Sequence, residues 1–324
     1  MNTLKIKRNL VRFQSVIALL IMCTALSFLS DRFLSADNAW NVMRQISVNV
    51  IISVGMTLVI LTGGIDLSVG SVLALSGAIT AFLLKSGTEV TSLNLYVGFT
   101  LTGALVGGTL VGIFLGWFNG LTITRFKVPP FVATLAMLTI ARGLIMLLTG
   151  GFPITGFSNQ MAYIGTGWFL EMPMPVWISA VIVFAAVVLT NKTRLGRHIY
   201  AIGGNETASE LSGLKIKKIK MIVYALAGAL SAIGGIIVTS RLDSAQPNAG
   251  TGFELDSIAA VVIGGTSLSG GKGTIMGTVQ GALIIGILNN GLVLLNVSPF
   301  WQQVIKGLVI LLAVVVEKFN SKKE

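Results

Sequence analysis

One glycine-rich stretch, GGTSLSGGKGT at 264–274, has the residue types that hold phosphate groups in nucleotide-binding loops. Such loops follow the pattern G-x-x-x-x-G-K-[ST], in which backbone amides and a lysine surround the phosphates. Here Thr266 stands where the first glycine is needed, and Gly273 stands where serine or threonine is needed. The stretch also lies between two apolar runs and follows no soluble strand. The sequence therefore predicts a tight turn carrying Lys272, and no nucleotide site.

The other residue types that support catalysis or metal binding are too few to form a site. The chain holds one cysteine, Cys23, and one histidine, His198. One thiol forms no internal disulfide, and neither residue has companions at the spacing of a metal site. We therefore expect no catalytic residues, no metal site and no enzyme activity in this chain.

The composition is that of a polytopic membrane protein. Hydrophobic residues make up 53% of the 324 residues and charged residues only 11%, whereas soluble domains carry about 25% charged residues. The mean hydropathy is +0.86. The net charge of +11 resides mostly in segments between apolar runs. Basic residues do not alternate with stacking aromatic residues, so nucleic-acid binding is not expected.

About ten membrane-spanning helices are predicted, which makes the fold all-α with a single domain over 1–324. A span needs roughly 20 apolar residues to cross about 30 Å of hydrocarbon. The eighth run is too short and is expected to form a half-helix or part of a re-entrant pair with the ninth. The apolar runs cover 14–34, 45–62, 66–85, 94–118, 131–149, 174–191, 219–240, 256–268, 273–295 and 300–317.

The distribution of lysine and arginine predicts the orientation of these spans. The N-terminal tail 1–13 is basic, and the run after it is too long for a signal peptide, so we expect a retained first span. With both termini in the cytoplasm, most of the 23 basic residues fall on the cytoplasmic side, as the positive-inside rule requires. The polar segment 192–218 then forms the largest cytoplasmic loop.

Asp66 lies at a Gly-Gly break between two apolar runs, in LTGGIDLSVG. Because it precedes Leu67 and Ser68, it is well placed as the N-cap of the next helix. The alternative is a gate near the inner mouth of a transport pathway. That gate would comprise Gly63, Gly64, Asp66 and Ser68.

Two basic residues, Arg142 and Lys306, fall inside predicted spans. Charged residues in spans are costly and usually functional, and we expect these two to pair with acids or to extend to the membrane surface. The spans hold no series of carboxylates for a proton relay. Any energy for transport must therefore come from a partner, or the protein is passive.

Small residues recur every four positions in two spans, which places them on one helix face. Such a face favours close helix packing within the bundle, and the alternative is a subunit interface or sliding surface. The two series are Gly108, Gly112, Gly116 and Gly120, and Gly273, Gly277 and Gly281. The stretches VILTGGIDLSVGSVLALSGAI and AVVIGGTSLSGGKGTIMGTVQGALI also share an apolar run, a Gly-Gly break and a second apolar run, as internal repeats of transporters do.

The stretch GGNETASELSGLK predicts a short helix with a cap at each end. Asn205 is a good N-cap, and Glu206 lies in the first turn, where the helix dipole favours negative charge. Gly213 suits the position that follows the last turn. A helix of about two turns is marginal alone in water, and the small Ala208 and Ser209 would permit close approach of a partner. The alternative is a solvated helix that only links two spans.

Four blocks resemble the permease subunits of ATP-binding-cassette importers for monosaccharides of the ribose type. They are VGMTLVILTGGIDLSVGSVLALSGA, TRLGRHIYAIGGNETASELSGLKIKKIK, RLDSAQPNAGTGFELDSIAAVVIGGTSLSGGKGT and LNNGLVLL, and the resemblance extends over nearly the whole chain. It implies that the capped segment is a cytoplasmic coupling helix in a cleft of the ATPase subunit. The residues implied are Asn205, Glu206, Ala208, Ser209, Ser212 and Gly213.

The resemblance also implies the partners and the mechanism. Two permease copies would form the pathway in the bacterial inner membrane, an ATPase would bind below, and a sugar-binding protein would dock on the outer loops 150–173 and 241–255. The expected mechanism is alternating access, with no cofactor on this chain, since ATP and magnesium act on the ATPase. Alternatives are a stand-alone secondary or passive sugar transporter, a membrane enzyme, a scaffold for the ATPase, and an importer of a sugar-like signalling molecule.

Overall fold

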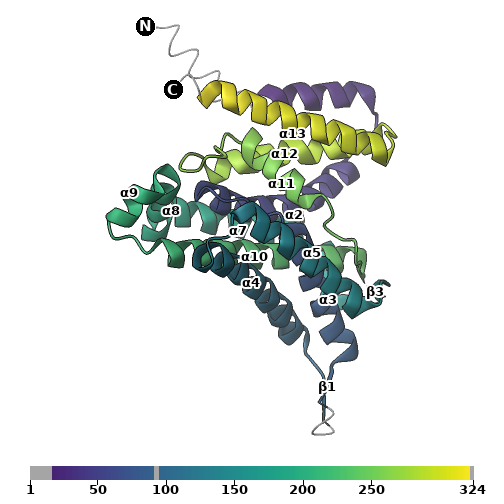
Figure 1. Ribbon diagram of the computed structural model, residues 1–324. Coiled ribbons are helices and arrows are strands. Elements are labelled where there is room, and N and C mark those ends of the chain that lie inside the picture. Colours follow the sequence, from purple (N-terminus) through teal and green to yellow (C-terminus); the bar gives the residue numbers. More distant parts are fainter. Residues whose placement is uncertain (1–16, 91–94, 322–324) are drawn as a thin grey trace.

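The computed structural model describes residues 17–90 and 95–321, and these form an almost wholly helical bundle (Figure 1). After the first described helix, Ile17–Leu29, the elements follow in chain order. They are α2 (Ala36–Leu61), α3 (Val69–Ser86), β1 (Thr88–Val90), β2 (Leu95–Val97), α4 (Leu101–Arg125), α5 (Pro130–Thr149), β3 (Ile154–Thr155), α6 (Asn159–Thr166), β4 (Trp168–Phe169), β5 (Met172–Pro173), α7 (Met174–Lys192), α8 (Arg194–Gly204), α9 (Glu206–Leu211), α10 (Ile216–Leu242), β6 (Ser244–Ala245), α11 (Phe253–Ile263), α12 (Ile275–Leu294) and α13 (Pro299–Ser321).

The helix lengths agree with a polytopic membrane protein. Seven of the described helices are long and apolar enough to cross a membrane, and Ile17–Leu29 and Pro299–Val315 are shorter apolar stretches. The eighth predicted run forms α11, which has 11 residues and at 1.5 Å per residue is about half as long as a span. The expectation of a half-helix is therefore confirmed, whereas a total of about ten spans and the orientation of the termini stay predictions.

Local sequence signals set where several helices begin. Pro130 occupies the first turn of α5 and Pro175 that of α7, where a missing amide hydrogen does no harm. The fourth predicted run differs from the structure, because α4 begins only after Thr100, whose side chain accepts a hydrogen bond from the Gly103 amide at 3.2 Å. The residues just before it form the hairpin of β1 and β2.

Helix α2 lies at the centre of the bundle, and α4, α5 and α7 lie at its surface. In α2, 89% of the residues in its most apolar stretch are buried. The corresponding share is only 28% in α4, 28% in α5 and 22% in α7. Helix α10 packs against α2, α3 and α4. The outer helices thus present apolar faces to lipid or to another subunit, because they are hydrophobic all round yet mostly uncovered.

The glycine series lie between helices of this one chain, except for Gly273, which the prediction placed on a helix face but which lies in the loop before α12 with φ +151, against Thr266. Gly112 and Gly116 leave no room for a Cβ against the backbone of Gly228 and Tyr224 on α10, and Gly281 leaves none against the Ala260 carbonyl on α11. The expectation of close internal packing is confirmed. A subunit interface at these glycines is not supported, because α10 and α11 of the same chain cover them, and a sliding surface during transport stays a prediction.

The segment between α10 and α11 turns back alongside α3. Gly235 on α10 packs against Leu73 of α3, and fifteen residues later Gly250 packs against Gly70, at the start of α3. Between them β6 pairs with β3, which joins the two loops 150–173 and 241–255. The chain therefore re-enters the depth of the bundle before α11 begins, which explains why α11 is only a half-length helix.

Candidate functional site

The short helix α9 is capped at both ends by its own sequence. The Asn205 side chain accepts a hydrogen bond from the Ala208 amide at 2.9 Å. At the other end the Leu214 amide donates to the Ser209 carbonyl at 3.1 Å, and the Gly213 amide donates to the Glu210 carbonyl at 2.9 Å. This pair of bonds closes a helix when the residue after the cap is left-handed, and Gly213 has φ +83. The predicted caps are confirmed.

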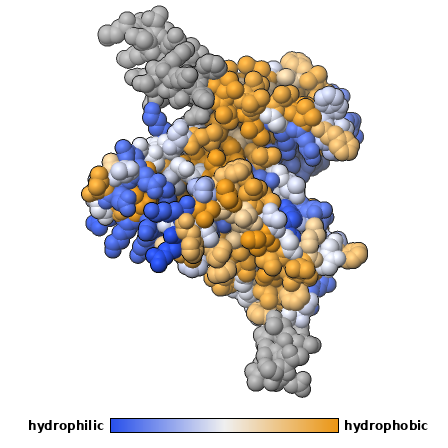
Figure 2. Space-filling view, viewed as in Figure 1, coloured by the Kyte–Doolittle hydropathy of each residue, from blue (hydrophilic) through white to orange (hydrophobic). Residues whose placement is uncertain are grey.

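Most of α9 faces outward, at one end of the bundle (Figure 1). Figure 2 shows that hydrophilic residues gather over this end. Of the six predicted coupling residues, Ser209 is buried against its own chain, and the other five are exposed. The sequence reasoning missed Leu211, whose side chain is 85% exposed at the end of α9. An ion pair of 2.7 Å between Lys220 and Glu206 ties α9 to α10.

Helix α8 connects α9 to the rest of the bundle through backbone contacts at glycine. A Cβ on Gly203 would overlap the Leu61 carbonyl and the Gly271 amide, so only glycine fits there. The Tyr200 hydroxyl donates to the Gly273 carbonyl at 2.8 Å, and burial raises the pKa of Tyr200 above its ordinary value, which keeps that donor protonated. Helix α8 is therefore in direct contact with both of these loops.

These two loops are the two Gly-Gly breaks that looked alike in the sequence. The first joins α2 to α3, the second joins α11 to α12, and each is a helix–turn–helix unit. The two loops touch through Gly270–Gly271, and not through Gly264–Gly265, which is the pair that matches Gly63–Gly64 in the sequence. The Gly271 amide donates to the Leu61 carbonyl at 3.0 Å, and a Cβ on Gly270 would lie 3.0 Å from the Gly63 nitrogen. We call the contact of Leu61–Gly63, Gly203 and Gly270–Gly271 the glycine junction.

A buried polar cluster lies beside the α2–α3 break. Asp66 Oδ1 accepts hydrogen bonds from the Ser68 amide at 2.9 Å and the Ser68 hydroxyl at 2.6 Å, and Asn119 on α4 donates to the Ser68 hydroxyl at 3.0 Å. The expectation that Asp66 caps the third helix is wrong by two residues. Ser68 occupies the cap position and α3 begins at Val69, while Asp66 stabilises the turn that leads into it.

The four predicted gate residues therefore have two different surroundings. Gly63 belongs to the glycine junction, whereas Asp66 and Ser68 belong to the buried polar cluster. Gly64 joins them, because a Cβ on it would overlap the hydroxyl of Tyr224 on α10. The turn between α2 and α3 is thus closely packed, with α8 on one side and Tyr224 of α10 on the other. Their action as a gate stays a prediction.

The two basic residues inside spans have partners. Lys306 on α13 makes an ion pair of 3.1 Å with Asp256 on α11, which confirms the expectation of an acidic partner. Arg142 on α5 instead donates to the carbonyls of Pro247 and Ala249 on the re-entrant segment. Arg142 also interacts electrostatically with the nearby Glu254 carboxylate, so the expectation of an acidic partner is met in part, with the two carbonyls as its hydrogen-bond partners.

Comparison with known proteins decides the family. Residues 38–314 match the family described as "Branched-chain amino acid transport system / permease component". The chain belongs to this permease family. Its membership accounts for the long apolar helices and for the lack of any catalytic set in the sequence, since permeases of this kind are transport components.

Several curated relatives cover nearly the whole chain. Ribose import permease protein RbsC of Haemophilus influenzae is 49% identical over 324 residues, which is 99% of this permease and 97% of the relative. Ribose import permease protein RbsC of Bacillus subtilis is 50% identical over 308 residues, 94% and 92% of the two chains. The xylose transport system permease protein XylH of Haemophilus influenzae is 34% identical, with 97% and 98% covered. No solved structure matches the permease.

Proposed function

We propose that this permease is the translocation subunit of an ATP-driven importer for ribose or a closely related monosaccharide. The choice of ribose as the cargo rests on the 49–50% sequence identity to ribose import permeases over nearly the full chain. The family description names branched-chain amino acids, but the relatives at 49–50% identity are ribose import permeases. A ribose-like cargo is therefore favoured over an amino acid.

The energy for transport would come from ATP hydrolysis by a separate subunit, and α9 would bind in a cleft of that subunit. An exposed, doubly capped helix that is held by the Glu206–Lys220 ion pair keeps its shape without a partner, so little ordering entropy is lost on docking. The rigid contact of α8 with the glycine junction offers a direct route from α9 to both helix breaks. ATP and magnesium would be bound by that subunit.

The other partners follow from the orientation that the basic residues predict. With α9 in the cytoplasm, the joined loops at β3 and β6 face outward and are the surface for a sugar-binding protein. The uncovered apolar faces of α4, α5 and α7 suit lipid and a second copy of the permease. The location would be the bacterial inner membrane, and transport would proceed by alternating access.

Reconstitution tests the proposal. The permease would be co-purified with a candidate ATPase and a sugar-binding protein and placed in vesicles with ATP inside. We expect ribose to stimulate ATP hydrolysis and to accumulate, and leucine to do neither. Accumulation of leucine instead of ribose would overturn the cargo. Uphill ribose uptake by the permease alone would overturn the ATPase-driven mechanism and establish a stand-alone transporter.

A labelling experiment tests the orientation separately. Replacement of Cys23 by serine leaves a chain without cysteine. A cysteine at the exposed Lys218, beyond α9, should then react with an impermeant thiol reagent only in inside-out vesicles. One at the exposed Gly151 should react only in right-side-out vesicles. The reverse pattern would place α9 outside the cell and exclude contact with a cytoplasmic ATPase.

A further inference from the structure

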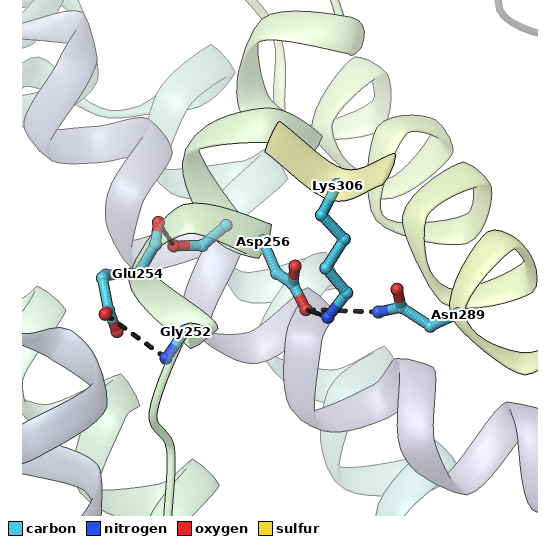
Figure 3. A network of polar contacts seen from close by, with 6 residues as sticks. Gly252, Glu254, Asp256, Asn289 and Lys306 are labelled. Atoms are coloured by element: carbon cyan, nitrogen blue, oxygen red, sulfur yellow. Dashed lines mark hydrogen bonds and ion pairs between the residues drawn. The ribbon is translucent and has the colours of Figure 1, made fainter. Parts of the chain in front are cut away.

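A polar network lies deep in the bundle at the first turn of α11 (Figure 3). Asp256 Oδ2 accepts from Lys306 Nζ of α13 at 3.1 Å and from Asn289 Nδ2 of α12 at 3.2 Å. Three different helices thus bring an ammonium, a carboxylate and an amide together. Charged groups in a membrane protein are costly and usually mark a substrate path or a relay.

The network keeps unused hydrogen-bonding capacity. Asn289 is 7% exposed, and within 17–90 and 95–321 no group of the protein bonds its Oδ1. Buried polar atoms without a partner are rare and call for an explanation. Figure 3 shows the Asn289 amide nitrogen directed at Asp256 and Lys306, with the amide oxygen on the side away from the pair. A ligand hydroxyl that donates to Asn289 Oδ1 would satisfy it.

The network is also open on one side. The Lys306 side chain is 30% exposed, whereas Asp256 is 5% exposed. Figure 2 shows hydrophilic surface in the hollow at the right-hand edge of the molecule, between the layer of α12 and α13 and the layer of α3 and α5. Helix α11 and the re-entrant segment, held by Arg142 on α5, lie between these two layers. Lys306 is thus the more accessible member of the ion pair.

We propose that Asp256, Lys306 and Asn289 form a contact site for the hydroxyl groups of a neutral sugar on its way through the permease. The carboxylate and the amide oxygen accept from hydroxyls, and the ammonium donates to them. The charges of Asp256 and Lys306 cancel, so the site holds no net charge that would retain an ion. This inference rests on the proposed sugar import, and it adds the residues that meet the cargo.

Cysteine labelling in the assembled importer tests whether the site is accessible to water and whether it contacts the transported sugar. In a Cys23→Ser chain, Lys306→Cys is compared with Leu308→Cys, an exposed apolar position on the other side of α13. A sulfonated methanethiosulfonate needs a thiolate in water, so we expect Lys306→Cys to react at least about tenfold faster than Leu308→Cys. Ribose with its binding protein should slow that reaction. Equal rates, or a rate that ribose does not change, would overturn the proposal.

A charge swap separates sugar contact from a purely structural ion pair. Asp256→Ala, which removes the acceptor oxygens, should lower ribose uptake by about tenfold or more, as loss of a hydroxyl acceptor does. The double variant Asp256→Lys/Lys306→Asp restores the ion pair, and we expect it to restore assembly with the ATPase but not uptake. Recovery of uptake in the double variant would show that the pair only fastens α13 to α11. Failure of ribose uptake in the unsubstituted importer would instead contradict the proposed function.

Discussion

The backbone amide of Gly271 donates a hydrogen bond to the carbonyl of Leu61 across 3.0 Å, which joins two helix breaks that lie about two-thirds of the chain apart. Gly203 of α8 fits between them so closely that a Cβ has no room. A segment that contacts both breaks can move them only together. The same contact connects the surface helix α9 to the centre of the bundle, and the predictions below start from it.

Gly203→Ala should uncouple transport from ATP hydrolysis. The added methyl would overlap the Leu61 carbonyl and the Gly271 amide, and such overpacking costs about 1–3 kcal/mol. We expect the ATPase to bind and to hydrolyse ATP, while ribose uptake per ATP falls. The control is Gly204→Ala, since nothing lies within 4 Å of a Cβ at that position. Equal uptake by the two variants would show that the junction does not transmit motion.

Leu211→Ala should weaken the association with the ATPase. A leucine that is 85% exposed on a polar surface gains by entering an apolar pocket, and truncation of a buried anchor costs about 2 kcal/mol. We expect roughly thirtyfold weaker binding in detergent with unchanged insertion into the membrane. Thr207→Ala, which alters an exposed residue of the same helix, should bind normally. Normal binding by Leu211→Ala would exclude this side chain as an anchor.

Gly213→Pro should disrupt the end of α9. Gly213 has φ +83, whereas proline fixes φ near −65° and lacks the amide that bonds the Glu210 carbonyl. We expect loss of ATPase-dependent uptake and normal amounts of permease in the membrane. Gly213→Asn, which tolerates the left-handed region, should retain most of the activity. Unchanged uptake in the proline variant would argue strongly against a coupling role for α9.

Gly112→Leu should destabilise the bundle. Its side chain would enter the contact of α4 with Gly228 and Ala232 of α10, at a cost of about 1–3 kcal/mol or more. We expect a lower unfolding temperature in detergent and less monodisperse protein. The matched control is Gly143→Leu, because a Cβ there has open space on α5. Equal thermal stability of the two variants would contradict close packing at Gly112.

The sequence predicted much of the helical architecture because its signals are local. Span length, proline in first turns and the caps of α9 depend on residues within a few positions of one another, and all are present in the structure. The half-length of α11 was also predictable, since its apolar run is short. The start of α4 and the cap of α3 were misplaced, because a hairpin and an Asp66–Ser68 turn compete with helix at those points.

The chain's own sequence determined that it is a polytopic membrane protein with a capped polar helix, since hydropathy and capping are properties of contiguous residues. The tertiary structure alone decided which face of each glycine series is covered, that Gly203 meets both helix breaks, and that Lys306 meets Asp256 and Asn289. These contacts join residues far apart in the chain. They depend on how rigid helices pack, and no local pattern encodes that packing.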